Sequence, residues 1–327
     1  MSAAGSRPGH DGTEGGVAPC EVAVVGAGPA GLTAAYYLGR YRRRTLIVHD
    51  GRSRAAGAPM AFNVPGFPDG ISGCDLLERL ERQAREYDVA FCEDKVVTMT
   101  RDSASGLYRL GLGAGVEVTA RGVILATGVV THEASLTEGD HARAVAAGAL
   151  RYCPICDGYE HKERDIAVLG SDLHGAAEAM FLRQYSHRVT LIPKHRVALD
   201  AAERAELEKS DIEIVEREVV RLCFDGTAII AEFAGETATR RFDTLYPALG
   251  STPRSELARS AGFETDADGC LPDDAFAQPL LPGLYAAGDV LAGLDQISTA
   301  TGHGALAATR LHNWLRSRDG HVMRGRR

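Results

Sequence analysis

The sequence predicts an α/β protein, because two separate stretches have the order of a parallel strand-helix-strand unit. The first unit has an apolar run, a glycine-rich turn, an alanine-rich helix and a second apolar run, at 21–25, 26–31, 32–40 and 45–50. The second unit repeats this order with a strand, a helix and a strand, at 166–170, 176–185 and 188–192. A parallel crossover of this kind is right-handed, so we expect two Rossmann-like domains, each a three-layer ββα domain.

The remaining segments predict how the two halves are joined. Alternating apolar and polar residues predict a hairpin at 108–112 and 116–120, and residues 122–128 form a buried strand that ends in a turn. Further alternation predicts a second small sheet, with strands at 213–220, 227–233 and 239–246. Residues 247–253 are the segment where the chain returns to the first domain. A strand at 284–289 and a final helix at 304–315 follow. Both ends of the chain then build one domain, which is discontinuous, and the middle is inserted into it.

Length and composition set the domain count and exclude some partners. The 327 residues exceed what one core covers, so we predict two domains after a disordered tail at 1–18. The first domain is discontinuous and comprises 19–131 and 250–327. The second domain, at 132–249, is inserted into it. The net charge of -8 offers no basic footprint for nucleic acid, and no apolar run approaches the length of a membrane span. Seven cysteines in so long a chain indicate mostly free thiols in a reducing compartment, so we expect a cytoplasmic protein.

The first glycine turn predicts a dinucleotide site. Gly26, Gly28 and Gly31 have the GxGxxG spacing, which lets the backbone turn tightly and approach a pyrophosphate at a helix N-terminus. Asp50 follows Gly31 by nineteen residues, near the offset at which an acid accepts the ribose 2′-hydroxyl. A strand precedes this turn and a helix follows it, as the motif requires. The turn itself leaves open whether the dinucleotide is FAD or NAD.

A second motif predicts dithiol chemistry. Cys153 and Cys156 are separated by two residues, a spacing that closes a small disulfide and favours a reactive thiolate. Asp157 follows at once and can carry the proton that moves when the disulfide opens or closes. A zinc site would need a second pair of ligands, but the other cysteines stand singly, at Cys20, Cys74, Cys92, Cys223 and Cys270. We therefore predict a redox pair and no metal site.

From about residue 21 to 314, the order of these motifs resembles the low-molecular-weight thioredoxin reductases, FAD-dependent pyridine nucleotide-disulfide oxidoreductases. The matching motifs are the GxGxxG turn, Ala126-Thr127-Gly128, the CxxCDG of Cys153 to Gly158, and Gly288-Asp289. The resemblance implies bound FAD, a homodimer and a thioredoxin-like or small dithiol/disulfide partner. It also implies that Cys156 faces the flavin, Cys153 exchanges with substrate and Asp157 is the acid/base. The inserted domain would swing on hinges near Thr131 and Gly250.

The resemblance also implies which residues hold the flavin. Asp289 would bond the ribityl chain, Asn63 would face the ring, and a backbone amide of the Gln296-Ile297 segment would point at it. Asp295 stands where the family has an arginine, so the electrostatics near the flavin should differ. The full set of expected cofactor residues is Gly26, Gly28, Pro29, Ala30, Gly31, Asp50, Asn63, Ala126, Thr127, Gly128, Gly288, Asp289, Gln296 and Ile297.

The second glycine turn departs from the family pattern for NADPH. In residues 170–175, Asp172 stands at the position of the middle glycine and adds bulk and a negative charge. Like charges about 4 Å apart cost roughly 4 kcal/mol at an effective dielectric of 20, equivalent to about three decades in binding. The phosphate clamp is also incomplete, since Leu199 replaces an arginine, and Lys194 and Arg196 form either a partial clamp or a solvated loop. NADPH is therefore a doubtful cofactor.

Several activities stay open at this point. The first is a thioredoxin-reductase-like enzyme, which Asp157 favours because the dithiol oxidases carry histidine after the second cysteine. The second is a dithiol oxidase that passes electrons to oxygen. The residues Tyr159-Glu160 after the CxxC motif resemble those oxidases more than the usual reductases. A third is a ferredoxin-linked reductase of the same fold, which also lacks the nucleotide clamp. A redox-sensing module without enzymatic activity has only the altered turn in its favour.

Overall fold

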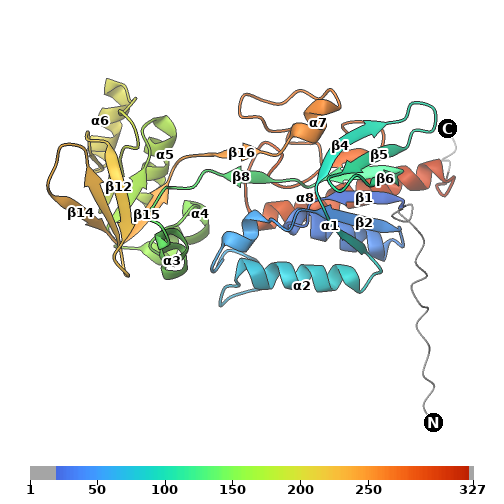
Figure 1. The fold of residues 1–327 in the computed structure, drawn as a ribbon, viewed down its shortest axis with the longest axis horizontal. Coiled ribbons are helices and arrows are strands. Elements are labelled where there is room, and N and C mark those ends of the chain that lie inside the picture. The colour runs from blue at the N-terminus through green and yellow to red at the C-terminus, as the bar shows by residue number, and fades with distance from the viewer. Residues whose placement is uncertain (1–19, 324–327) are drawn as a thin grey trace, which may run out of the picture.

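A five-stranded parallel sheet draws its strands from both ends of the chain (Figure 1). The structure, a computed structural model, describes residues 20–323, so the predicted tail at 1–18 lies outside the described residues. The strand order is β17-β7-β1-β2-β3, with bounds Leu284–Ala286, Gly122–Leu125, Val22–Val25, Thr45–His49 and Ala90–Glu93. Strands β1 and β7 are fully buried, as their apolar sequences require.

Two further layers cover this sheet. One face packs against the helices α1, α2 and α8, at Pro29–Arg40, Gly73–Arg85 and Ile297–Arg318. The other face packs against an antiparallel sheet of β4, β5 and β6, at Val96–Arg101, Tyr108–Leu112 and Glu117–Ala120. The predicted hairpin is present, and β4 adds a strand that the prediction did not contain. The layers follow the predicted ββα order.

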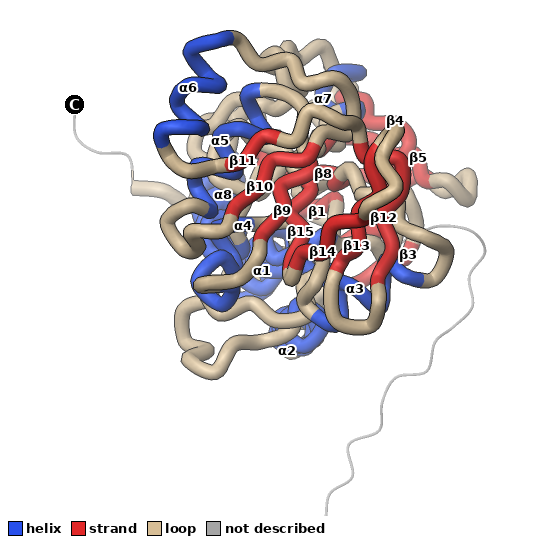
Figure 2. Tube along the Cα trace, turned by 90° about the vertical axis from the view of Figure 1, so that its left-hand side faces the viewer, coloured by secondary structure: helices blue, strands red, loops and turns tan. Residues whose placement is uncertain are grey.

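The middle of the chain builds a second unit on the same plan. Its parallel sheet has the order β11-β10-β9-β15, with bounds Glu213–Ile214, Val189–Ile192, Ile166–Leu169 and Thr244–Pro247. Helices α5 (Leu173–Leu182) and α6 (Ala201–Lys209) cover one face. The other face carries α3 (Asp140–Ala147) and an antiparallel sheet of β12, β13 and β14, at Val219–Phe224, Ile229–Phe233 and Thr239–Phe242. Figure 2 shows these layers on opposite sides of the parallel strands.

Two strands link the units. Strand β8 (Val129–Thr131) pairs antiparallel with β16 (Ser251–Pro253), and Figure 1 shows this ribbon between the two units. The His132 ring lies across the link, with Nδ1 2.8 Å from the Leu249 carbonyl and Nε2 2.8 Å from Thr252 Oγ1. Gly250 has φ of +76°, a conformation that glycine adopts without strain, and it turns the chain back towards β16.

Some predicted elements have the wrong bounds. The strand expected at 239–246 is two strands, because the chain leaves the antiparallel sheet after β14 and enters the parallel sheet as β15. The strand expected at 213–220 likewise divides between β11 and β12. The final helix begins at Ile297 and not at 304. The glycines of α8 lower its intrinsic helix propensity. A Cβ at Gly304 would lie 2.2 Å from the Ala30 carbonyl oxygen, so glycine at this position permits close packing of α8 on α1.

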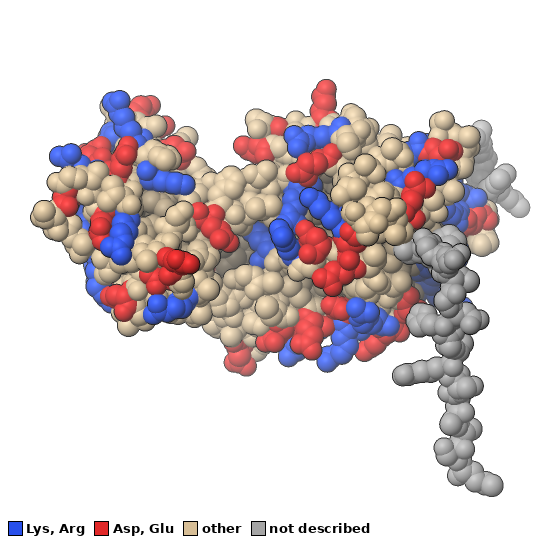
Figure 3. All heavy atoms as spheres, in the orientation of Figure 1, with Lys and Arg blue, Asp and Glu red and all other residues tan. Residues whose placement is uncertain are grey.

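The charged residues of the surface are mixed in sign. Figure 3 shows basic and acidic side chains interspersed over the face in view. Within residues 20–323, no helix has both the length and the apolar character needed to cross a bilayer.

Candidate active site

The first glycine turn joins the end of β1 to α1 at the carboxyl edge of the sheet. Gly26 has φ of +109°, and a Cβ at this position would lie 2.2 Å from the Ala126 carbonyl oxygen at the end of β7. A Cβ at Gly31 would lie 1.9 Å from the Gly26 carbonyl oxygen. Only glycine permits these approaches, so the turn holds α1 tightly against the strand ends.

The N-terminus of α1 is open to a ligand. Its N-cap residue is Gly28, which has no side chain to cap the first amides, and Pro29 begins the helix. The nearest atom to a Cβ placed at Gly28 is Ser53 Oγ at 3.5 Å. Gly288, at the end of β17, closes against α1, because its Cβ would lie 2.9 Å from the Ala30 Cβ. This cradle of uncapped amides fits the pyrophosphate of a dinucleotide.

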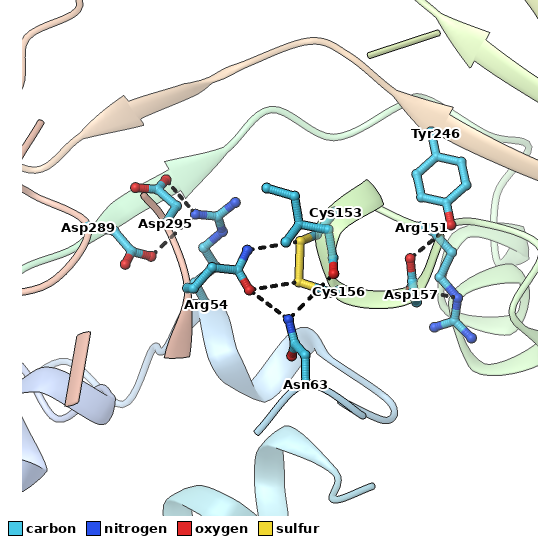
Figure 4. The surroundings of a disulfide bond; sticks show 11 residues. Arg54, Asn63, Arg151, Cys153, Cys156, Asp157, Tyr246, Asp289 and Asp295 are labelled. Atoms are coloured by element: carbon cyan, nitrogen blue, oxygen red, sulfur yellow. Dashed lines mark hydrogen bonds and ion pairs between the residues drawn. A yellow bond between two sulfur atoms is a disulfide. The ribbon is translucent and has the colours of Figure 1, made fainter. Parts of the chain in front are cut away.

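A half-buried acid and an arginine lie next to this cradle. Asp289 accepts a hydrogen bond from Arg54 Nη1 at 3.2 Å, and the same nitrogen donates to Asp295 at 2.7 Å (Figure 4). Burial and then the nearby Asp295 charge raise the pKa of Asp289, Arg54 lowers it, and together they bring the pKa to about 6. The family resemblance implied an arginine before Gln296, where this sequence has Asp295. The structure shows that Arg54, which we did not predict, supplies a guanidinium there from a distant segment.

The acid at the end of β2 is exposed and paired. Asp50 Oδ2 lies 3.5 Å from Arg254 Nη1, and the Arg254 backbone is itself held by Thr127, whose hydroxyl donates to the Arg254 carbonyl at 2.6 Å. The Arg254 amide donates to the Gly128 carbonyl at 2.9 Å. The returning chain therefore lies beside the strand ends at Asp50 and Thr127. Arg254 is a further residue that the sequence analysis missed.

The cysteine pair forms a disulfide against the first unit. Cys153 and Cys156 are bonded, with Cα atoms 5.3 Å apart, and the short helix α4 (Pro154–Asp157) contains the second of them. Gln296 Nε2 donates to Cys153 Sγ at 3.4 Å, and Gln296 Oε1 lies 3.6 Å from Cys156 Sγ. Asn63 Nδ2 donates to the same Gln296 oxygen at 2.9 Å. The fold thus brings four of the predicted residues together from three distant segments (Figure 4).

Asp157 lies on the other side of the disulfide, inside the second unit (Figure 4). It is buried, its Oδ1 accepts a hydrogen bond from the Tyr246 hydroxyl at 2.8 Å, and its Oδ2 lies 3.3 Å from Arg151 Nε. Burial raises the pKa of Asp157 to about 6, while the Tyr246 hydrogen bond and the Arg151 charge lower it. This carboxyl can take up or release a proton near neutral pH. Tyr246 and Arg151 were not predicted, because nothing near them in the sequence marks them.

The second glycine turn is closed by its own acid. Asp172 is the N-cap of α5, and its Oδ1 accepts from the amides of His174 at 3.1 Å and Gly175 at 3.2 Å. With this cap the helix begins at Leu173, three residues before the predicted start. The first amides, which are open on α1, are therefore occupied by a carboxylate on α5.

Lys194 and Arg196, which the sequence left as either a partial phosphate clamp or a solvated loop, lie on the surface. Lys194 and Arg196 are exposed, and within residues 20–323 their side chains form no ion pair. Leu199 belongs to the core beneath α5 and α6. No group of three His, Cys, Asp or Glu side chains in the described part of the chain could hold a metal ion.

Comparison with known proteins identifies the family. The family model described as pyridine nucleotide-disulphide oxidoreductase matches residues 20–304. A thioredoxin reductase of Streptomyces coelicolor is 31% identical over 300 residues, which cover 88% of this chain and 91% of the relative. A thioredoxin reductase of Listeria innocua is 28% identical over 314 residues, covering 90% and 93%.

Solved structures show the same fold. The crystal structure of HlmI matches with a TM-score of 0.84 and 28% identity, over 92% of this chain and 94% of that chain. The thioredoxin reductase of Streptococcus pyogenes matches with a TM-score of 0.83 and 22% identity, over 92% and 99%. With the disulfide set beside an open dinucleotide cradle, these matches show that the chain belongs to the pyridine nucleotide-disulphide oxidoreductase family, as an FAD-dependent disulfide oxidoreductase of the thioredoxin-reductase-like class.

Proposed function

We propose that the protein exchanges an electron pair between its flavin and an external dithiol or disulfide, through Cys153 and Cys156, without using NADPH. The position of the disulfide carries the first part of this proposal. The disulfide lies against Gln296 and Asn63, and Gln296 is the N-cap of α8, the helix that packs on α1. The closed N-terminus of α5 supports the second part, because Asp172 already occupies the amides that a nucleotide would need.

Each reactive residue has a distinct role in the proposal. Cys156 is the sulfur that faces the flavin, and Cys153 is the sulfur that exchanges with the partner. Asp157 supplies or removes the proton through its buried carboxyl, whose charge is governed by Tyr246 and Arg151. When bound, FAD supplies the two-electron redox chemistry. The polypeptide holds the disulfide, controls the proton and admits the partner.

The cofactor site is proposed on the residues around α1. The cradle comprises the glycine turn with Pro29 and Ala30, and Asp50 is the ribose acceptor. Ala126, Thr127 and Gly128 line the end of β7, while Gly288 and Asp289 close the cradle beside Ala30. Asn63, Gln296 and Ile297 complete the ring site. Arg54 joins this set, because it pairs with Asp289.

The domain division is proposed at the two-stranded link. The pairing of β8 with β16 supports boundaries at 131/132 and 249/250, with the hinges near Thr131 and Gly250. Rotation about this link would carry Cys153 away from Gln296 and towards a partner. A homodimer and a cytoplasmic location stay predictions.

A thioredoxin-like protein is the partner that we propose first. The relatives from Streptomyces coelicolor and Listeria innocua are thioredoxin reductases. Asp157, which follows the second cysteine, supports the same class of partner. In this direction the dithiol of the enzyme reduces the disulfide of the partner, and an electron donor other than NADPH reduces the flavin. A ferredoxin is one such donor.

A dithiol oxidase is the second candidate, and the capped α5 favours it. Without a nucleotide donor, electrons can enter the flavin from a substrate dithiol through Cys153 and Cys156. Oxygen would then accept the electron pair. Tyr159 and Glu160, which follow the disulfide, support this candidate by their resemblance to the oxidases.

The test is to mix the oxidised holoenzyme anaerobically with NADPH, with NADH or with dithiothreitol, and to follow the flavin absorbance band. We expect no bleaching by either nucleotide and rapid bleaching by the dithiol. Recovery of the band in air, with consumption of oxygen, would select the oxidase. Slow recovery in air, but rapid reoxidation by an oxidised thioredoxin, would select the reductase.

Two variants sharpen this test. Cys153→Ser and Cys156→Ser should each abolish bleaching by the dithiol, whereas Cys74→Ser, which alters an exposed free cysteine, should leave it unchanged. Bleaching by NADPH at the rate of the dithiol reaction would contradict the nucleotide-independent proposal. A Cys153→Ser protein that still reacts fully with the dithiol would contradict the assigned sulfur role.

A further inference from the structure

We propose that the Gln296 side chain directs the opening of the disulfide, by stabilising Cys153 as the leaving thiolate and keeping the proton on Cys156. This inference deepens the proposed function and rests on it, since it concerns the same sulfur pair. Gln296 was expected to act through its backbone near the flavin. Its side chain also reaches both sulfurs, and this gives it a separate role.

The orientation of the Gln296 amide follows from its neighbours. The Ile155 carbonyl oxygen can only accept a hydrogen bond, and Asn63 Nδ2 lies 3.5 Å from it. That contact turns the NH2 group of Asn63 towards Ile155, and the same nitrogen donates to Gln296 Oε1 at 2.9 Å. The oxygen of Gln296 is thereby committed to Asn63. Its NH2 group must point the other way, towards Cys153 Sγ at 3.4 Å.

The two ends of the amide then treat the two sulfurs differently. The N–H group that faces Cys153 stabilises negative charge on that sulfur. The carbonyl oxygen that lies 3.6 Å from Cys156 disfavours negative charge there, but it can accept a hydrogen bond from a thiol. One side chain therefore favours the thiolate at Cys153 and the thiol at Cys156.

This polarity fits the direction of electron transfer. When the disulfide takes up two electrons and one proton at Cys156, the S–S bond breaks, Cys156 becomes a thiol and Cys153 leaves as a thiolate. The flavin, reduced in the enzyme's own reaction, supplies the electron pair. In the reverse direction, the Cys153 thiolate forms the S–S bond to Cys156, while Cys156 gives up its proton and the electron pair. In both directions, the charge that Gln296 stabilises lies on the sulfur that is free to exchange.

No other described side chain competes for this role. Within residues 20–323, Gln296 is the one side chain with a polar contact to either sulfur of the pair: its Nε2 donates to Cys153, and its Oε1 lies beside Cys156. Five charged residues flank the disulfide in Figure 4 and are engaged with one another: Arg54, Arg151, Asp157, Asp289 and Asp295. Their pairing leaves the amide of Gln296 as the polar group directed at the sulfurs.

The test measures the reactivity of each sulfur and does not depend on turnover. The holoenzyme is reduced anaerobically with a phosphine, treated with limiting iodoacetamide from pH 5.5 to 9, and digested. Tandem mass spectrometry of the peptide 152–162 then reports alkylation at Cys153 and Cys156 separately. Because the thiolate is the reacting species, we expect Cys153 to react about ten times faster than Cys156 at pH 7.

Three variants separate the inference from simple changes in access. Gln296→Leu should lower the Cys153 rate about tenfold at pH 7 and move its pH profile upward by about one unit. Asn63→Ala touches neither sulfur but releases the orientation of the amide, so it should produce a smaller change in the same direction. Gln278→Leu is the matched control, because its exposed side chain has no hydrogen-bond partner within residues 20–323. It should leave both rates unchanged.

The outcomes distinguish this inference from the proposed function. Equal reactivity of the two cysteines in the wild-type protein, or an unchanged Cys153 profile in Gln296→Leu, would overturn the role of Gln296. The anaerobic bleaching by dithiol is measured independently on the same wild-type protein. If that bleaching fails while the alkylation preference is present, the proposed function is wrong and the polarity of the amide stands.

Discussion

Burial dominates the pKa of the proposed acid/base, and a single hydrogen bond adjusts it. Asp157 has a pKa raised to about 6 by burial, and the Tyr246 hydroxyl, which donates at 2.8 Å, favours the charged carboxylate. Tyr246→Phe keeps the buried ring but removes this donor. The pKa should therefore rise further, and the protonated form should persist to higher pH. We expect the midpoint of the pH profile for dithiol bleaching to move upward by about one unit, measured by stopped flow from pH 5 to 8.

A second buried tyrosine provides the control for this prediction. Tyr285 lies in the sheet of the first unit, and its hydroxyl has no hydrogen-bond partner within residues 20–323. Tyr285→Phe should leave the midpoint in place. If Tyr246→Phe also leaves it in place, Asp157 is not the group that the profile reports, and another acid moves the proton.

The two glycine-turn helices differ at their N-termini, and this difference predicts the effect of a single cap. Asp172→Gly removes the carboxylate from the first amides of α5, at a cost of only a few tenths of a kcal/mol in helix stability. Removing the like charge should raise NADPH affinity by roughly two to three decades. Titration of the anaerobic enzyme with NADPH, followed by the flavin band and by isothermal calorimetry, measures this gain.

Helix α6 offers a matched control, because Asp200 caps it in the same way. Asp200 accepts from the amides of Ala202 at 2.8 Å and Glu203 at 2.9 Å. Asp200→Gly should cost similar stability and leave NADPH affinity unchanged. An Asp172→Gly enzyme that binds NADPH no better than the wild type would show that the sparse clamp at Lys194 and Arg196, and not the cap, excludes the nucleotide.

At the scale of the whole molecule, a narrow link joins the two units. His132 bonds to Leu249 and Thr252 across the ribbon that joins the two units, and the disulfide faces the first unit. His132→Ala removes both contacts, so leaving this arrangement should become easier by about 1 kcal/mol. Since about 1.4 kcal/mol is tenfold, we expect exchange with the proposed thioredoxin-like partner to become about fivefold faster. Stopped-flow mixing with the reduced protein partner measures this rate.

Small dithiols provide the internal comparison for the link. Dithiothreitol is small enough to reach the sulfurs without a rotation of the units, so its rate should be unchanged in His132→Ala. His312→Ala, on α8 and remote from the link, should change neither rate. Equal acceleration of both reactions in His132→Ala would contradict a gating role for the link.

The sequence by itself determined the two α/β units and the reactive pair. The glycine turn at Gly26 and the CxxC at Cys153 are local patterns, because a turn, a helix start and a small disulfide depend on residues a few positions apart. The cap formed by Asp172 is equally local, since an N-cap acts on amides two and three residues away, but we had interpreted Asp172 only as added bulk and charge. These features could therefore be read before any fold was known.

The tertiary structure alone decided which side chains surround that pair. Tyr246 lies 89 positions from Asp157, and Arg54 lies 235 positions from Asp289. Gln296 was found by its motif, but its contact with Cys153, 143 positions away, was not. Contacts of this range depend on how the sheets and the link place distant segments, and no local periodicity records them. The same reason explains why the strand expected at 239–246 was not seen to change sheets at Asp243.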